Sequence, residues 1–278
     1  MSRVEQVPFI LGKSYLPNHD ENRMGGEGDV IYARENFLRD RFPNLDYLLQ
    51  SRYCWMNEYI NVDDVILEIG CGAGFSSLYL KKKPILTDAV KNKWVEKCID
   101  ATSMDIENES IDILIVQNAI HHCYSPFRFF MEALRVLKPG GRIMIQEVNN
   151  SLLMRIILRL MRQEGWSYDI DIFNENEMVT DKYDLWSGNN AIPQLLFSDE
   201  KKFNTAFHCK KYRLVIEFNQ LCECFIFPLS GGVTSKINIP QLPLEFMKFA
   251  NFIDKIITKI WPSIFAMARR VVIQKKTL

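Results

Sequence analysis

Between positions 61 and 150 the hydrophobic residues are grouped in short, uninterrupted runs. Four such runs lie at 65–70, 84–89, 111–118 and 142–148. Stretches with helical spacing of apolar residues lie between them, at 75–83 and 126–137. Strands that are apolar on both faces belong to parallel sheets covered by helices on both sides. The alternation therefore predicts a doubly wound α/β domain with a mostly parallel sheet.

The segments on either side of this region have other patterns. Residues 34–60 have apolar positions at helical spacing, which predicts two helices. Residues 151–163 predict an amphipathic basic helix, and residues 244–268 predict a helix broken at Pro262. We expect the part before Pro262, residues 244–260, to cover the sheet. Three further runs are expected to be strands that complete the sheet: 212–218, 222–227 and 269–275.

The composition is that of an ordinary globular protein. Of the 278 residues, 47% are hydrophobic and 24% are charged, and the formal net charge is zero. The charge is unevenly distributed, because residues 201–278 contain thirteen Lys and Arg but four Asp and Glu. Such a segment faces an anionic substrate or a membrane surface, or keeps an apolar segment in solution, and these alternatives stay open. The neutral total argues against nucleic acid as a partner.

The seven cysteines indicate a reducing environment. Their number is odd, and no pair of CxxC motifs suggests a zinc site. The first residues lack the basic start and apolar core of a signal peptide, and no apolar run is long enough to span a membrane. We therefore expect a cytoplasmic protein with reduced cysteines and without a metal site, and the oligomeric state stays open.

A glycine-rich turn follows the first predicted strand. The sequence Glu68-Ile69-Gly70-Cys71-Gly72-Ala73-Gly74 lets the backbone approach a ligand closely and directs free amide groups toward it. The spacing is GxGxG rather than GxGxxG, because position 75 is Phe. An acidic residue, Glu68, precedes the glycines, and a carboxylate there suits a cationic ligand better than an anionic one. Such a turn alone is weak evidence, since nicotinamide and flavin enzymes use one too.

An acidic residue also ends the second predicted strand. Asp88 is placed where a carboxylate accepts both hydroxyls of an adenosine ribose. This placement supports an adenosine-containing cofactor without distinguishing a dinucleotide from a methyl donor.

Three further blocks distinguish between these cofactors. They are residues 100–104 (DATSM), 109–112 (ESID) and 135–141 (RVLKPGG), and His121-His122 follows the run at 111–118. In this order the blocks resemble those of the class I S-adenosylmethionine-dependent methyltransferases. Within that class they resemble the subgroup that methylates quinones and small molecules. The resemblance covers about residues 60–150. It implies a Rossmann-like, seven-stranded sheet and S-adenosylmethionine as the cofactor.

The resemblance also implies roles for individual residues. The glycines would flank the methionine part of the cofactor, and Glu68 would organise that loop. Asp88 would hold the ribose, and Asp100 would accept from the adenine amino group. Ala101 and Met104 would border the adenine ring, and Gln117 would lie near the sulfonium end. Where the family has Pro after Met104, this chain has Asp105, which would compete with Asp100 for adenine. The residues assigned to the cofactor are Glu68, Gly70, Cys71, Gly72, Gly74, Asp88, Asp100, Ala101, Met104 and Gln117.

Methyl transfer is an in-line displacement that depends mainly on positioning and exclusion of water. A hydroxyl acceptor also needs a base, and His121 and His122 are the nearest catalytic candidates in the sequence. Alternatively, one of them packs against or caps the following helix. Glu147, at the end of the run at 142–148, either points toward the same edge of the sheet or is a solvated strand end.

The acceptor is the part on which the sequence is least informative. In the helix at 151–163, Arg155, Arg159 and Arg162 share a face that would grip a phosphate or anionic lipid, or simply be solvated. Trp166, Tyr168 and Trp186 would stack on a sugar or form a small core. The segments 165–169, 191–199 and 226–233 resemble bacterial methyltransferases encoded with glycan-assembly enzymes.

These observations predict four regions. A helical extension at 1–60 contributes to a lid, 61–150 bind the cofactor, 151–200 form a cap over the acceptor, and 201–278 complete the sheet. We expect methyl transfer to a small molecule or a saccharide, including a lipid-linked one, with peripheral membrane contact as a further expectation. The alternatives are a nicotinamide-dependent oxidoreductase and a non-catalytic protein that binds S-adenosylmethionine. Nucleic acid is excluded as acceptor because Gln117-Asn118-Ala119-Ile120 stands where an Asn-Pro-Pro-Tyr-like motif would be.

Overall fold

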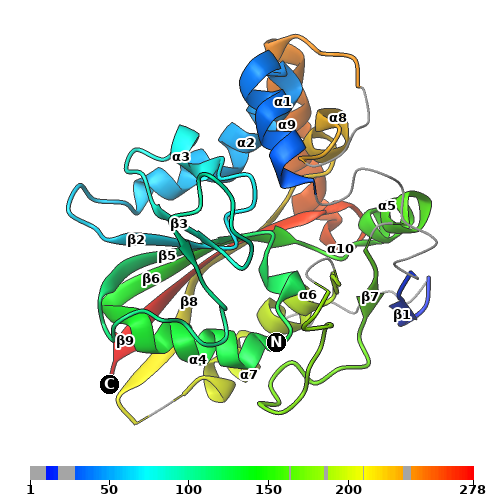
Figure 1. Ribbon diagram of the computed structural model, residues 1–278. Coiled ribbons are helices and arrows are strands. Elements are labelled where there is room, and N and C mark those ends of the chain that lie inside the picture. The colour runs from blue at the N-terminus through cyan, green and yellow to red at the C-terminus, as the bar shows by residue number, and fades with distance from the viewer. Residues whose placement is uncertain (1–10, 18–28, 163, 185–186, 209, 234–238) are drawn as a thin grey trace.

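The computed structural model describes residues 11–17, 29–162, 164–184, 187–208, 210–233 and 239–278. Its centre is a seven-stranded sheet of order β4-β3-β2-β5-β6-β9-β8 (Figure 1). All neighbouring pairs from β4 to β6 are parallel, and β9 is antiparallel to both β6 and β8. The strands are β2 Ile66–Ile69, β3 Ile85–Asp88, β4 Lys97–Cys98, β5 Ile111–Gln117, β6 Leu137–Val148, β8 Tyr212–Cys222 and β9 Ala268–Thr277. The predicted doubly wound, mostly parallel α/β fold is confirmed.

Helices cover both faces of the sheet. The side chains of the central strands are therefore buried on both sides, as their uninterrupted apolar runs require. On one face, Leu114 and Val116 of β5 pack in a core with α4 (Pro126–Val136), α6 (Ile192–Phe197) and α7 (Glu200–Ala206). On the other face, Ile113 and Ile115 pack with the N-terminal helices and with α8 and α9 (Figure 1). The bounds on this side are α1 Val30–Asp40, α2 Pro43–Tyr53, η1 Cys54–Glu58, α8 Ile226–Ser230 and α9 Leu244–Ile260.

Two sequence predictions of secondary structure were wrong in extent or type. The helix expected at 75–83 is only α3, Ser76–Tyr79. Three lysines and Pro84 follow it, and a proline disfavours helical backbone at the preceding residue. The strand expected at 222–227 is absent, because β8 ends at Cys222 and α8 begins at Ile226.

The N-terminal segment lies against the part of the chain that follows β6. Strand β1 (Ser14–Tyr15) pairs antiparallel with β7 (Trp166–Ser167), just beyond α5 (Leu152–Met161). A Cβ on Gly165 would lie 2.0 Å from the carbonyl oxygen of Tyr15, so only glycine permits this close pairing. The remaining predicted lid residues, 1–10 and 18–28, lie outside the described residues.

Helix α9 covers the sheet at its edge strand β8, as predicted, and also packs on α2 and α8. Its buried face includes Met247, Ala250, Asp254 and Thr258. Asp254 accepts hydrogen bonds from the backbone N–H groups of Phe225 and Ile226. The outward face is apolar, and its side chains are largely exposed: Phe249 60%, Phe252 59%, Ile256 42% and Ile260 56%. A short helix, α10 (Pro262–Phe265), follows at the predicted break.

No helix among the described residues is both long enough and apolar enough to cross a membrane.

Candidate active site

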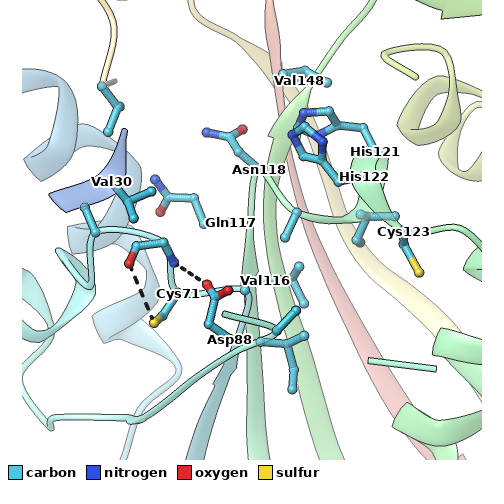
Figure 2. A pocket seen from close by; sticks show the side chains of 18 of the residues that line it. Val30, Cys71, Asp88, Val116, Gln117, Asn118, His121, His122, Cys123 and Val148 are labelled. Atoms are coloured by element: carbon cyan, nitrogen blue, oxygen red, sulfur yellow. Dashed lines mark hydrogen bonds between the residues drawn. The ribbon is translucent and has the colours of Figure 1, made fainter. Parts of the chain in front are cut away.

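A cavity of about 850 Å³ opens at the carboxyl ends of β2, β3 and β5. The strand order reverses direction between β2 and β5, and ligands of open α/β sheets bind at such a point. Figure 2 shows Gln117 and Asn118 at the end of β5, between Asp88 on one side and the His121–His122 pair on the other. The cavity therefore joins the predicted cofactor residues to the predicted catalytic ones.

The glycine-rich turn forms one wall of the cavity. Gly70 and Gly72 line it, and both have positive φ, at 66° and 49°. A Cβ on Gly70 would meet the Cβ of Ala119 at 2.7 Å, whereas one on Gly72 would meet only Val30, at 3.8 Å. Gly72 thus leaves open space beside the backbone. Gly74 does not line the cavity but packs beneath Trp94, whose ring a Cβ there would meet at 2.7 Å.

Glu68 lies below this turn rather than in the cavity. It is fully buried and accepts a hydrogen bond from Ser76 through Oε2, while Oε1 has no partner among the described residues. Burial raises the pKa of Glu68 to about 8, although the Ser76 hydrogen bond acts in the opposite direction. Glu68 does not line the cavity, so it is not placed to face a cationic ligand there, whereas its position beneath the turn agrees with the role of organising this loop that the resemblance implies. Glu68 is a protonated residue that supports the turn from beneath.

Asp88 connects β3 to the glycine-rich turn. Its Oδ2 accepts from the N–H of Gly72 at 2.9 Å (Figure 2), and its Oδ1 accepts from the N–H of Val90 at 3.0 Å. Cys71 lines the same wall, and burial raises the pKa of its thiol so that the thiol stays neutral. The carboxylate oxygens of Asp88 keep further lone pairs for a ligand hydroxyl.

Asp100 lies in a second polar corner of the cavity. Its Oδ1 accepts from the N–H and the hydroxyl of Thr102, and its Oδ2 accepts from the Tyr124 hydroxyl at 3.1 Å. Burial acts to raise the pKa of Asp100, but these hydrogen bonds and the nearby Lys182 lower it overall, so the group is ionised.

Of the other residues predicted around adenine, Ala101 lines the cavity and Met104 is buried away from it. The Asp105 side chain is 95% exposed and pairs with Lys97 at 2.9 Å. It does not lie with Asp100 in the cavity, so the expected competition between the two carboxylates is wrong.

Gln117 ends β5 and lines the cavity. Its Oε1 atom is buried and has no hydrogen-bond partner among the described residues. A buried acceptor left unsatisfied costs about 1–3 kcal/mol, so its presence here favours a ligand that donates a hydrogen bond.

Two histidines and two glutamates form a cluster at the opposite end of the cavity. The Nδ1 atom of His121 lies 2.7 Å from Oε2 of Glu147, and its Nε2 atom lies 3.3 Å from Oε2 of Glu164. The Nε2 atom of His122 lies 3.3 Å from Oε1 of the same Glu164. His121, His122 and Glu164 line the cavity.

Glu147 is not a solvated strand end, which corrects one of the two sequence interpretations. It is fully buried, and its Oε1 accepts from the N–H groups of Ala119 and Ile120, both at 2.6 Å. Burial lowers the pKa of His121, but Glu147 and Glu164 more than reverse this and raise it to about 10. His121 is therefore a cation at neutral pH and a poor general base in this state.

Helix α5 forms an apolar wall, which corrects the prediction that its arginines face the acceptor. Its residues in the cavity wall are Met154, Ile157, Leu158 and Met161. Arg155 is fully buried and lies over the rings of Trp166 and Tyr168, at 5.9 and 5.5 Å. Arg159 lies 4.7 Å from the ring of Tyr15 and donates to the carbonyl of Leu11.

Arg159 thus attaches α5 to the N-terminal segment, Arg155 attaches it to the residues in and after β7, and neither lines the cavity. Arg162 ends the helix in a left-handed conformation. Trp166 belongs to a small hydrophobic core, as one of the two sequence interpretations had it, and Trp186 lies outside the described residues.

Comparisons with known proteins find similarity mainly in the central part of the chain. Residues 67–145 match the sequence model of a family described as a methyltransferase domain. The mitochondrial 2-methoxy-6-polyprenyl-1,4-benzoquinol methylase of Caenorhabditis elegans is 38% identical over 63 residues, which are 22% of this chain and 21% of that protein. The malonyl-[acyl-carrier protein] O-methyltransferase of Marinomonas sp. (strain MWYL1) is 28% identical over 115 residues, 35% of this chain and 43% of that protein. The chain thus spans less than half the length of either relative.

Among solved structures, an Archaeoglobus fulgidus SAM-dependent methyltransferase superposes with a TM-score of 0.48 at 17% identity. The superposition covers 87% of this chain and 99% of that one.

Proposed function

Residues 67–145 match a family described as a methyltransferase domain, and from this premise we propose that the chain is a class I, S-adenosylmethionine-dependent enzyme that methylates an acceptor with a polar head and an apolar tail. One observation carries the proposal. A single cavity joins the glycine-rich turn, Asp88 and Asp100 to the polar histidine–glutamate cluster and to the apolar face of α5. Donor and acceptor can therefore meet in one water-poor space, which an in-line displacement requires.

The residues of the donor half fit S-adenosylmethionine. Gly72 leaves room beside the backbone for its methionine part, Asp88 would accept from the ribose, and Asp100 from the adenine amino group. Gln117 lines the same space, and its Oε1 atom, buried and without a partner among the described residues, is suited to a donor such as the ammonium group of the cofactor. When bound, the cofactor supplies an electrophilic methyl group.

The acceptor half has two different walls. Met154, Ile157, Leu158 and Met161 of α5 offer an apolar surface, and the histidine–glutamate cluster offers a polar one. An acceptor that satisfies both places its reacting group by the cluster and its tail along α5. A lipid-linked saccharide meets this description, as does a quinol with an apolar chain.

The outward face of α9 supports delivery of such an acceptor from a membrane surface. Phe249, Phe252, Ile256 and Ile260 form an exposed apolar stripe, and Lys248, Lys255 and Lys259 lie along one edge of it. Among the described residues of α9, Glu245 is the one exposed acid, and it is paired with Lys248. A helix with an exposed apolar stripe and a basic edge suits the boundary of an anionic bilayer.

The proposal is tested by methyl transfer from labelled S-adenosylmethionine to extracts of cells that make the protein. We expect protein-dependent label in the organic-solvent fraction, which holds lipids, and little in the aqueous metabolite fraction. Asp88→Asn should strongly reduce the label, while the exposed Asp105→Asn serves as the matched control and should keep it.

Label confined to the aqueous fraction would contradict the apolar acceptor. Cofactor binding without transfer to any fraction would support a non-catalytic protein instead.

A further inference from the structure

The histidine–glutamate cluster has the donor set and the spacing of a metal site. One ligand atom each from His121, His122 and Glu164 lie within 4.8 Å of one another. Two imidazoles and a carboxylate are a donor set that catalytic zinc sites use, with the remaining position open to water or substrate.

The two contacts of Glu164 are longer than direct hydrogen bonds. The Nε2 atom of His121 lies 3.3 Å from Oε2 of Glu164, and the Nε2 atom of His122 lies 3.3 Å from Oε1, so the carboxylate meets each imidazole with a different oxygen. A charge-assisted N–H···O hydrogen bond is about 2.7–2.9 Å long, as the contact of His121 with Glu147 is at 2.7 Å. A tetrahedral zinc ion with bonds of about 2.0–2.1 Å separates its ligand atoms by roughly 3.3–3.4 Å.

Surrounding groups hold the three ligands in orientation. Glu147 binds Nδ1 of His121, which leaves Nε2 directed at the cluster, and Glu147 is itself held by two backbone N–H groups. The Nδ2 atom of Asn190 donates to Oε2 of Glu164 at 2.8 Å. Gly188 packs on the cluster so closely that a Cβ would lie 3.0 Å from Cδ of Glu164 and 3.1 Å from Cε1 of His122. A carboxylate on the far nitrogen of a ligating histidine is a common second layer of metal sites.

We propose that His121, His122 and Glu164 bind one divalent transition-metal ion of the zinc class, with a coordination position open to the cavity. The sequence analysis expects no metal site, and Glu164 is distant from the histidine pair along the chain. The role of the ion rests on the proposed function. In methyl transfer, an ion here would hold an acceptor hydroxyl and make it easier to deprotonate.

The test is calorimetric titration of Zn²⁺ into chelator-treated, dialysed protein without cofactor or acceptor. We expect one ion per chain in the wild type, and at least 100-fold weaker binding in His122→Ala and Glu164→Gln. His208 is a histidine outside the cluster, so His208→Ala is the matched control and should bind Zn²⁺ as the wild type does.

A second titration with S-adenosylhomocysteine separates this inference from the proposed function. All of these variants should keep the affinity of the wild type for that ligand, which also shows that they are folded. Wild-type protein that binds S-adenosylhomocysteine but takes up no more Zn²⁺ than Glu164→Gln would overturn the metal site alone. Wild-type protein that binds Zn²⁺ but not S-adenosylhomocysteine would overturn the proposed function and leave the metal site standing.

Discussion

Glu68 is a buried carboxyl group directly before the glycine-rich turn. In the structure it is enclosed, bonded to Ser76 and uncharged at neutral pH. It therefore supports the turn without presenting a charge to the ligand.

Replacing this buried acid should alter the pH dependence of stability. In the unfolded chain Glu68 ionises near its ordinary pKa of 4.5, whereas in the folded protein burial raises its pKa to about 8. Between these values the unfolded state releases a proton that the folded state keeps, so the wild type loses stability as pH rises. Glu68→Gln has no titrating group there. Its free energy of unfolding relative to the wild type should increase by on the order of 2–3 kcal/mol from pH 6 to pH 9.

Denaturant unfolding at several pH values measures this difference, with the exposed Glu58→Gln as control. Parallel pH profiles for wild type and Glu68→Gln would mean that Glu68 is ionised in the folded protein.

Some residues of the site can be identified from a local sequence motif. Others can be identified only from the three-dimensional fold. Asp88, Asp100 and Gln117 line the cavity as the sequence predicted, because each follows a recognisable strand or block. Glu164 follows α5 in an irregular segment, and no local pattern relates it to the histidines. Contacts of this kind depend on where a connecting segment returns to the sheet.

At the scale of elements, the buried strands and the helix α4 were predictable because their apolar runs and spacings are strong. The orientation of the surface helices was harder to predict. The apolar face of helix α5 lines the cavity, and Arg155 and Arg159 contact aromatic residues in or near β1 and β7, while Ile156 and Leu160 are exposed. The pattern identified the helix but could not say which neighbour each face would meet.

Helix α9 has the reverse arrangement, with a small and polar face inside and an apolar face outside. Replacing Phe249 and Phe252 together with Ser should abolish flotation of the protein with vesicles that contain phosphatidylglycerol. Because both side chains are more than half exposed, the thermal stability should hardly change. Replacing Lys255 and Lys259 with Gln should weaken flotation with these anionic vesicles.

The matched control is a double replacement of Val62 and Met178 with Ser, two exposed apolar residues outside α9. It should float as the wild type does. If the wild type does not float, and instead forms dimers that the α9 replacements dissociate, the stripe is an interface between two copies.

At the scale of the whole molecule, the strand order determines where the site lies. Reversal between β2 and β5 brings the glycine-rich turn, Asp88 and the end of β5 to one edge of the sheet, and the alternating pattern was enough to predict this. What could not be predicted is how α1, α5 and the segment around Phe227 and Val233 enclose the cavity. These segments lie far apart in the sequence and have no shared motif.

The central claim is that the cavity binds S-adenosylmethionine, and calorimetric titration with S-adenosylhomocysteine tests it most directly, with NAD⁺ titrated in parallel. We expect one molecule of S-adenosylhomocysteine to bind per chain and NAD⁺ not to bind. In Asp88→Asn, binding should weaken by about 1–3 kcal/mol, the usual cost of losing charge-assisted hydrogen bonds. Binding of NAD⁺ in place of S-adenosylhomocysteine, or an affinity that Asp88→Asn leaves unchanged, would contradict the account.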